Sequence, residues 1–174
     1  ANPLLAALRS SASLYGNFTA DHPALVYTGD WEFSDLGADI PLEYANASIA
    51  LTFQGSDLAL RVRRGNYRGY FYVEVDGRPA NLLPQDERGA YLVLTSPTLA
   101  PEVAQVPVAS GLAPNTPHTV VIRPERGWDQ WAFVGFAAGA VSRAGETYRA
   151  LTSALGLVAL VALLGAVYFG RRLN

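Results

Sequence analysis

The sequence of 174 residues contains no cysteine, no methionine and no lysine. The absence of cysteine excludes disulfides, thiolate nucleophiles and zinc sites with cysteine ligands. All 13 basic residues are arginine, a usage typical of GC-rich bacterial genomes. Because methionine is absent, we expect Ala1 either to follow a removed leader or to begin a piece of a longer chain. The opening Ala-Asn-Pro favours a removed leader.

An excess of positive charge is lacking as well. The net charge at pH 7 is −2, and residues 1–170 carry 11 arginines against 15 acidic side chains. Proteins that bind nucleic acid need a basic surface to neutralise phosphates, so this balance excludes nucleic acid as a partner. The local group of arginines within 61–68 is expected to line the solvent side of a strand and its turn.

One long apolar run stands apart from the rest of the chain. Residues 151–169 read LTSALGLVALVALLGAVYF and carry no charge. A helix of this length spans roughly 28 Å, close to the hydrocarbon thickness of a bilayer. Tyr148 and Tyr168 lie near its ends, where amphipathic rings suit the membrane interface. The sequence therefore predicts one transmembrane helix at residues 151–170.

This helix determines the expected layout and partners. A juxtamembrane linker is expected at 141–150 and a short cytoplasmic tail at 171–174. Arginines flank both ends of the helix equally, so the orientation depends on the large acidic N-terminal part, which we expect outside a bacterial cell membrane. The small residues that suit close packing with another helix are Ala154, Ala162, Gly165 and Ala166. Membrane lipid and protein subunits of a membrane complex are the expected partners.

Alternation of apolar and polar residues begins after residues 1–23, which we interpret as an N-terminal lead-in. The three clearest segments read ASIALTF at 47–53, DLALRVR at 57–63 and GYFYVEV at 69–75. Their inward residues are predicted to be Ala47, Ile49, Leu51, Phe53, Leu58, Leu60, Val62, Phe71, Val73 and Val75. A period of two residues is typical of antiparallel strands with one buried face.

Turn residues support these strands. Asp76-Gly77 predicts a two-residue hairpin, because both central positions of a type I′ turn need a positive φ. Further strands are predicted at 25–27, 31–33, 90–94, 103–108, 119–123 and 131–136, which makes eight or nine in total. The predicted fold is mainly β: an antiparallel β-sandwich of the jelly-roll type over residues 24–140, followed by the transmembrane helix.

Four motifs in this region resemble a known kind of module. They are Gly29-Asp30-Trp31, Phe53-Gln54-Gly55, a tyrosine-rich strand that leads into Val75-Asp76-Gly77, and His118-Thr119. Over about residues 28–138 the pattern resembles the carbohydrate-binding-module-type jelly rolls of bacterial extracytoplasmic proteins, which accompany glycosidases and esterases. The resemblance implies a sugar site built from exposed aromatic side chains and polar loops, in some modules with structural calcium. It is a likeness of fold, without a match of binding residues one by one.

Outward aromatic side chains are the best candidates for a ligand site. Tyr70 and Tyr72 share a strand face with Glu74, and the preceding turn holds further candidates, Asn66, Tyr67 and Arg68. A flat ring beside hydrogen-bonding groups suits a pyranose, which offers C–H faces and hydroxyls. The alternative is that a second sheet, a loop or a partner subunit covers these rings.

Tryptophans provide the second candidate. Trp128 lies in a loop between two predicted strands, beside Arg126 and Asp129, and is a candidate for an exposed platform. Trp131 is expected in the core because it alternates with Phe133. The role of Trp31, near the N-terminal edge of the sandwich, stays open between core and platform.

Catalytic constellations are lacking. His22 and His118 are the only histidines, neither has a partner at metal-ligand spacing, and no Gly-x-Ser-x-Gly elbow occurs. Asp35 and Asp39 are expected to be solvated or capping residues, with an acid–base or calcium role as the alternative. The sequence therefore predicts a protein that is not an enzyme and has no cofactor. A structural calcium ion remains compatible with it but is not indicated.

Three functions remain open at this point. The first is a membrane-anchored module that binds glycan or partner proteins through Tyr67–Tyr72 and Trp128. The second is an accessory single-span subunit of a bacterial membrane complex. The third is the outer domain and first span of a longer, multi-span glycan-processing protein. Exposure of Tyr70, Tyr72 and Trp128 is the feature that distinguishes the first two.

Overall fold

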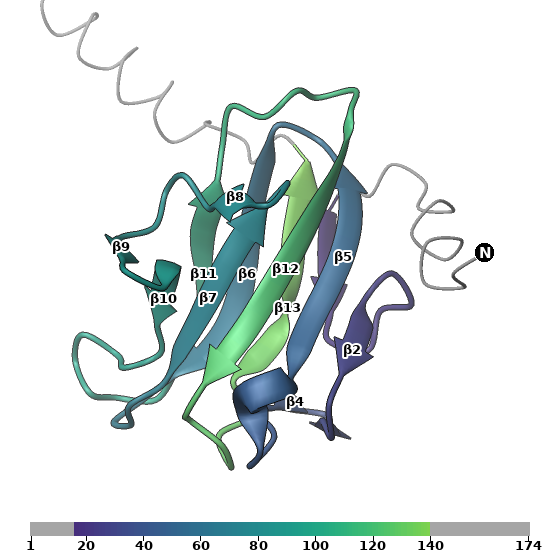
Figure 1. The fold of residues 1–174 in the computed structure, drawn as a ribbon. Coiled ribbons are helices and arrows are strands. Elements are labelled where there is room, and N and C mark those ends of the chain that lie inside the picture. The colour runs from purple at the N-terminus through teal and green to yellow at the C-terminus, as the bar shows by residue number, and fades with distance from the viewer. Residues whose placement is uncertain (1–15, 140–174) are drawn as a thin grey trace, which may run out of the picture. The chain divides into compact units, whose positions relative to one another are not determined.

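The computed structural model describes residues 16–139. Across these residues, thirteen strands form two antiparallel sheets that pack as a sandwich, with one short helical turn (η1, Tyr44–Asn46) (Figure 1). Sheet A has the order β11 (Glu102–Ala109), β6 (Asp57–Arg64), β13 (Phe133–Gly139), β4 (Gly37–Asp39) and β3 (Glu32–Ser34), and β1 (Gly16–Thr19) also pairs with β13. Sheet B has the order β2 (Val26–Thr28), β5 (Ser48–Gln54), β12 (Pro117–Glu125), β7 (Tyr70–Val75), β10 (Gly89–Val93) and β9 (Gln85–Asp86), and β8 (Arg78–Pro79) also pairs with β7.

The C-terminal part of the predicted layout lies outside the described residues. This applies to the linker at 141–150, to the helix at 151–170 with Ala154, Ala162, Gly165 and Ala166, and to the tail at 171–174. Within residues 16–139, no helix has the length and apolar character that a membrane span requires. The mainly-β, two-sheet fold is confirmed, and the anchor stays a prediction.

Strands that follow each other closely along the chain often belong to different sheets. Only Gly55 and Ser56 separate β5 from β6, yet β5 pairs with β12 in sheet B and β6 with β13 in sheet A. The same change of sheet occurs between β6 and β7 and between β12 and β13. The short turns are therefore corners of the sandwich, and the side chains that face inward from both layers form one core.

The predicted inward faces are confirmed in all three of the clearest segments. Ile49, Leu51 and Phe53 of β5 are completely buried, and so are the apolar residues of β6 that alternate with Ala59 and Arg61. On β7, Phe71 and Val73 are likewise completely buried. Ala59 is also completely buried, although it lies on the other side of β6.

The hairpin predicted at Asp76-Gly77 is present between β7 and β8. Asp76 has a φ of 53° and Gly77 a φ of 71°, and Val75 pairs with Arg78 across the turn. Positive φ at both central residues defines the type I′ turn. This turn also positions the Asp76 carboxylate beside β12.

The prediction for Trp131 is wrong. Trp131 precedes β13, has a φ of 51° and is only partly buried, whereas Ala132 and Phe133 fill the core. The alternation does not extend to Trp131, because β13 begins only at Phe133 and the left-handed backbone of Trp131 still belongs to the preceding loop. Four short strands, β1, β4, β8 and β9, were also not predicted, and β1 lies within the expected lead-in.

Strand β11 forms one edge of sheet A within the described part of the chain. Its pairing with β6 is regular from Glu102 to Pro107 and then shifts before Ala109. Proline lacks the N–H that a further strand would need, and a bulge twists the strand locally. The edge is thus irregular near its C-terminal end.

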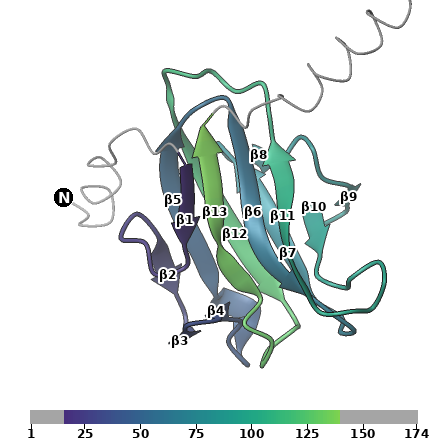
Figure 2. The same cartoon turned by 180° about the vertical axis from the view of Figure 1, so that it is seen from behind.

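The close approach of β1 to β13 depends on a glycine (Figure 2). Gly135 has a φ of 146°, and a Cβ atom placed on it would lie 2.0 Å from the carbonyl oxygen of Phe18. No side chain fits at that distance. The absence of a side chain at position 135 therefore allows β1 to join the sheet.

Replacing Gly135 with alanine is expected to destabilise the sandwich by about 3 kcal/mol, since a strained φ and a backbone clash add together. Gly89→Ala is the matched control: Gly89 has a φ of 129°, but no atom lies within 4 Å of the position that its Cβ would take. The Gly89→Ala variant should therefore lose only the free energy that backbone strain costs, about 1 kcal/mol. Urea unfolding of both variants measures the difference, and equal losses would contradict a role for the β1 contact.

His118, at the start of β12, is buried with both ring nitrogens bonded. Nδ1 lies 2.7 Å from Asp76 Oδ2, and Nε2 lies 2.9 Å from the carbonyl oxygen of Ala113. Donation to two acceptors requires the protonated imidazolium. Burial alone lowers the pKa of His118, but the hydrogen bond and charge of Asp76 and the Ala113 carbonyl raise it more, so the pKa lies above its ordinary value of 6.5.

Because the folded state raises the pKa of His118, it binds this proton more tightly than the unfolded chain does. We expect the resulting stabilisation to be fully present below about pH 6.5 and to be lost as the pH rises through the folded pKa. Urea unfolding between pH 6 and 9 tests this. Asp76→Asn is the control, because asparagine suits the positive φ of the turn but carries no charge. It should flatten the profile, and an unchanged slope would refute the pairing.

Candidate functional site

Two of the three predicted tyrosines lie on the outer surface of sheet B, together with one tyrosine that sequence reasoning missed. Tyr70 and Tyr72 project from β7, and Tyr91 of β10 is directly opposite Tyr72 in the strand register. The ring of Tyr91 lies 6.0 Å from that of Tyr70 and 6.1 Å from that of Tyr72. These three residues are referred to as the tyrosine face.

Tyr72 is covered and does not offer a free ring. It is 8% exposed, and its hydroxyl donates to Asp86 Oδ2 over 2.9 Å. The guanidinium carbon of Arg88 lies 4.6 Å from the ring centroid, while Arg88 also pairs with Asp86 and Glu125. Burial raises the pKa of Tyr72 to about 12, and the hydrogen bond to Asp86 acts in the same direction. Tyr72 is therefore a neutral, structural residue of this face.

The other charges of the tyrosine face are also paired. Arg123 Nη1 and Nη2 donate to the two carboxylate oxygens of Glu74, over 2.6 and 3.3 Å. Arg68 Nε donates to the hydroxyl of Tyr70 over 3.2 Å, and its guanidinium lies 5.8 Å from the Tyr70 ring. A ligand at this face has to compete with these contacts. Tyr70 and Tyr91, both partly exposed, are the rings that remain open to it.

Two predicted site residues lie in the loop between β6 and β7 instead. Asn66 is exposed. Tyr67 is half-buried: its hydroxyl donates to the Arg63 carbonyl, and its own carbonyl accepts from Thr95 Oγ1 over 2.7 Å. Burial raises the pKa of Tyr67 to about 12. Tyr67 therefore supports the loop and is not a platform for a ligand.

Trp128 lies in the loop between β12 and β13 and is 45% exposed, as an exposed platform requires. The backbone of this loop is unusual, with positive φ at Arg126, Gly127, Asp129 and Trp131. Such conformations cost free energy and persist only where other contacts enforce them. The contacts that enforce them come from Asp39.

Asp39, at the end of β4, is 7% exposed and holds the Trp128 loop through its carboxylate. Oδ2 accepts the N–H of Asp129 over 2.5 Å, and Oδ1 accepts those of Gln130 and Trp131 over 3.2 and 3.1 Å. Oδ1 also accepts the N–H of Ile40 over 2.8 Å. Successive backbone N–H groups that converge in this way form an anion-binding nest. Asp39 is thus a capping residue, one of the roles expected from the sequence.

A hollow of about 230 Å³ lies beside Trp128, and we refer to it as the Trp128 hollow. Its polar lining includes Asp30, Glu32 and Asp129, whose carboxylates have no hydrogen-bond or ion-pair partner within the part of the chain that the structure describes. The apolar lining includes Leu42, which is 70% exposed. The hollow therefore combines one flat aromatic ring with several free hydrogen-bond acceptors.

The structure separates the predicted site into two places. Tyr70 and Tyr72 belong to the tyrosine face, with Glu74 and Arg68 beside them, whereas Trp128 belongs to the loops at one end of the sandwich. Trp31 is 9% exposed and donates its indole N–H to the Thr28 carbonyl, so it belongs to the core. Among residues 16–139, no group of three or more His, Cys, Asp or Glu side chains lies together as metal ligands would.

Replacing Asp39 with asparagine is expected to cost about 2 kcal/mol of stability, because one acceptor oxygen becomes an N–H₂ group facing backbone donors. The amides of residues 129–131 should also exchange faster with solvent. Asp30→Asn is the matched control, since this neighbouring carboxylate bonds to none of them. Amide hydrogen exchange by NMR measures the effect. Unchanged protection at 129–131 would contradict the role of Asp39.

Comparisons with protein families and with curated proteins find no match. Solved structures similar to the chain include a family two carbohydrate esterase from Clostridium thermocellum in complex with cellohexaose (TM-score 0.47, 22% identity), and an active-site mutant of such an enzyme (0.48, 23%). Each covers 67% of this chain, which spans 31% of theirs. A family two carbohydrate esterase from Cellvibrio japonicus has a TM-score of 0.47 and 15% identity, over 72% of this chain and 35% of its own.

The chain thus spans about a third of the length of these structures. Identities of 15–23% and TM-scores below 0.5 are too low to transfer a ligand, a reaction or a site residue.

Proposed function

We propose that the chain is a non-catalytic glycan-binding module, held at a bacterial membrane by residues 151–170 with the sandwich outside the cell. We assign the sugar site to the Trp128 hollow. One observation carries this assignment: an exposed indole, on a loop locked by a buried carboxylate, lies beside carboxylates that have no partner in residues 16–139.

The chemistry of this hollow suits a sugar. A pyranose has apolar C–H faces, which pack on a flat ring such as that of Trp128, and hydroxyls, which donate to acceptors such as Asp30 and Glu32. The loop is already ordered by Asp39, so binding loses little conformational entropy there. A few placed polar groups of this kind can fix the orientation of a bound ligand.

The tyrosine face is less suited to the same role. Its most buried ring, that of Tyr72, lies under Arg88, and the arginines and acids around it already pair with each other. A sugar placed there gains few free hydrogen-bond partners. Tyr70 and Tyr91 nevertheless provide a matched pair of partly exposed aromatic residues for control variants.

A glycan array followed by calorimetry with the full chain in detergent tests the proposal. We expect Trp128→Ala to weaken binding at least about tenfold, as truncation of a central aromatic anchor does. The double variant Tyr70→Ala and Tyr91→Ala is the control and should bind like the unmodified chain. Trp128 is exposed, so its loss should leave the unfolding temperature nearly unchanged.

Two outcomes count against the proposal. If no glycan binds to the unmodified chain, the function as a glycan-binding module fails. If binding survives Trp128→Ala but is lost in the tyrosine double variant, the sugar site lies on the tyrosine face and the assignment to the Trp128 hollow is wrong.

A further inference from the structure

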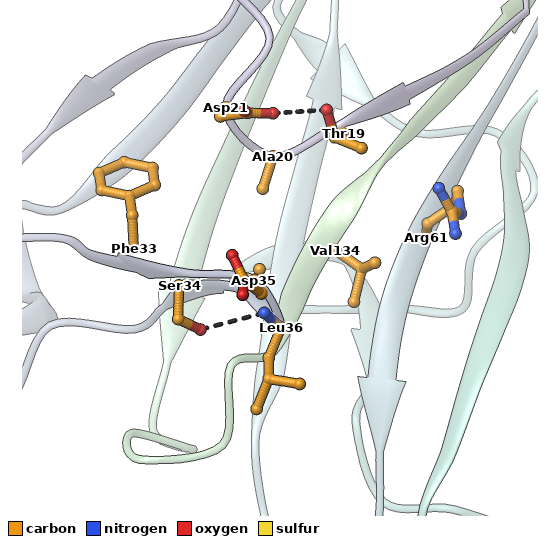
Figure 3. A pocket seen from close by; sticks show the side chains of 10 residues that line it. Thr19, Ala20, Asp21, Phe33, Ser34, Asp35, Leu36, Arg61 and Val134 are labelled. Atoms are coloured by element: carbon orange, nitrogen blue, oxygen red, sulfur yellow. Dashed lines mark hydrogen bonds between the residues drawn. The ribbon is translucent and has the colours of Figure 1, made fainter.

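A larger hollow, of about 490 Å³, lies on the outer surface of sheet A (Figure 3). The turn after β1 and the turn between β3 and β4 form its walls, and Arg61 of β6 and Val134 of β13 belong to its floor. Its volume falls within the range of about 300–1,000 Å³ that is usual for small-molecule sites. It shares no lining residue with the Trp128 hollow, so it can be considered on its own.

Arg61 supplies a free cation to this hollow. Its side chain has no hydrogen bond or ion pair with any described residue, whereas the neighbouring Arg63 donates to the Leu36 carbonyl over 2.9 Å. A guanidinium carries five N–H donors in a planar fork that matches a carboxylate. Of these two arginines on the expected solvent side of β6, Arg63 is therefore structural, whereas the guanidinium of Arg61 is free to bind a ligand.

Negative charge lies across the hollow from Arg61. Figure 3 shows Asp21, Asp35 and Phe33 on the side away from the guanidinium. Asp35 has no partner within residues 16–139, and Asp21 accepts the Thr19 hydroxyl through Oδ1 alone, which leaves Oδ2 free. Phe33 is 52% exposed, so its ring is available to a cation.

We propose that this hollow binds a small zwitterion with a primary ammonium and a carboxylate. The ammonium lies between Asp21 and Asp35, beside the Phe33 ring, and the carboxylate pairs with Arg61. The charges of the hollow exclude simpler ligands: a pure anion meets two carboxylates, and a pure cation leaves Arg61 unpaired and is repelled by it. A zwitterion matches both ends, and it has no net charge to oppose its approach to an acidic protein.

The test is calorimetry of the full chain with a series of ω-amino acids, from glycine to 6-aminohexanoate. The distance between the ammonium and the carboxylate increases along this series. Each member is compared with the alkylamine and the alkanoate of the same length. We expect one length to bind best, and to bind at least about tenfold more tightly than either single-charge analogue, since each analogue lacks one charged pair.

Two variants assign the ends of the ligand. Arg61→Gln should make the best amino acid bind no better than its alkylamine, and Asp35→Asn should bring it close to its alkanoate. Arg78→Gln, which removes an exposed arginine at the β7–β8 turn, is the matched control and should change nothing. Arg61→Lys keeps the positive charge but lacks the planar guanidinium, so it should bind the amino acid with intermediate affinity. Such a result would show that Arg61→Gln loses a contact with the ligand and is not simply misfolded.

The proposal is overturned if no member of the series binds at millimolar concentration, or if the single-charge analogues bind as tightly as the amino acids. It is also overturned if affinity is lost in Trp128→Ala and kept in Arg61→Gln, because the site then lies elsewhere. None of these results depends on glycan binding, so either proposal can fail without the other.

Discussion

The carboxylate of Asp39 is the contact on which the Trp128 end of the sandwich depends. It joins the end of β4 to a loop that lies 90 to 92 residues further along the chain, and it satisfies three backbone N–H groups there at once. Because β3 and β4 form one wall of both hollows, this single contact fixes the Trp128 loop against the hairpin that shapes them. An uncharged core residue at position 39 would leave those amides without acceptors.

Local features of the fold were predictable from the sequence. The inward faces of β5, β6 and β7 follow from alternation, and the Asp76-Gly77 hairpin follows from the positive φ that its two residues tolerate. Trp131 was placed wrongly because the loop with left-handed backbone conformations extends to it and β13 begins only at Phe133. Contacts between distant segments could not be predicted from the sequence, because they depend on the register between paired strands.

The candidate site, too, could be predicted only in part. Exposure of Trp128 was predicted from its place in a loop, but the capture of that loop by Asp39 joins residues with no pattern in common. Tyr91 could have been found, because Ala90 and Leu92 point inward and leave it outward. Its position opposite Tyr72 depends on the pairing of β10 with β7. The arginines that cover and pair this face show that an outward aromatic residue need not be an open one.

The irregular edge formed by β11 has a consequence for the behaviour of the chain at high concentration. An open strand edge is a template on which a second copy can add a strand, and long regular edges promote aggregation. In β11, Pro107 lacks an N–H donor and the shifted pairing before Ala109 bends the strand, so a docking copy would lose register after a few residues. The sandwich is thereby protected at this edge against self-association through strand addition, and it achieves this without a single lysine.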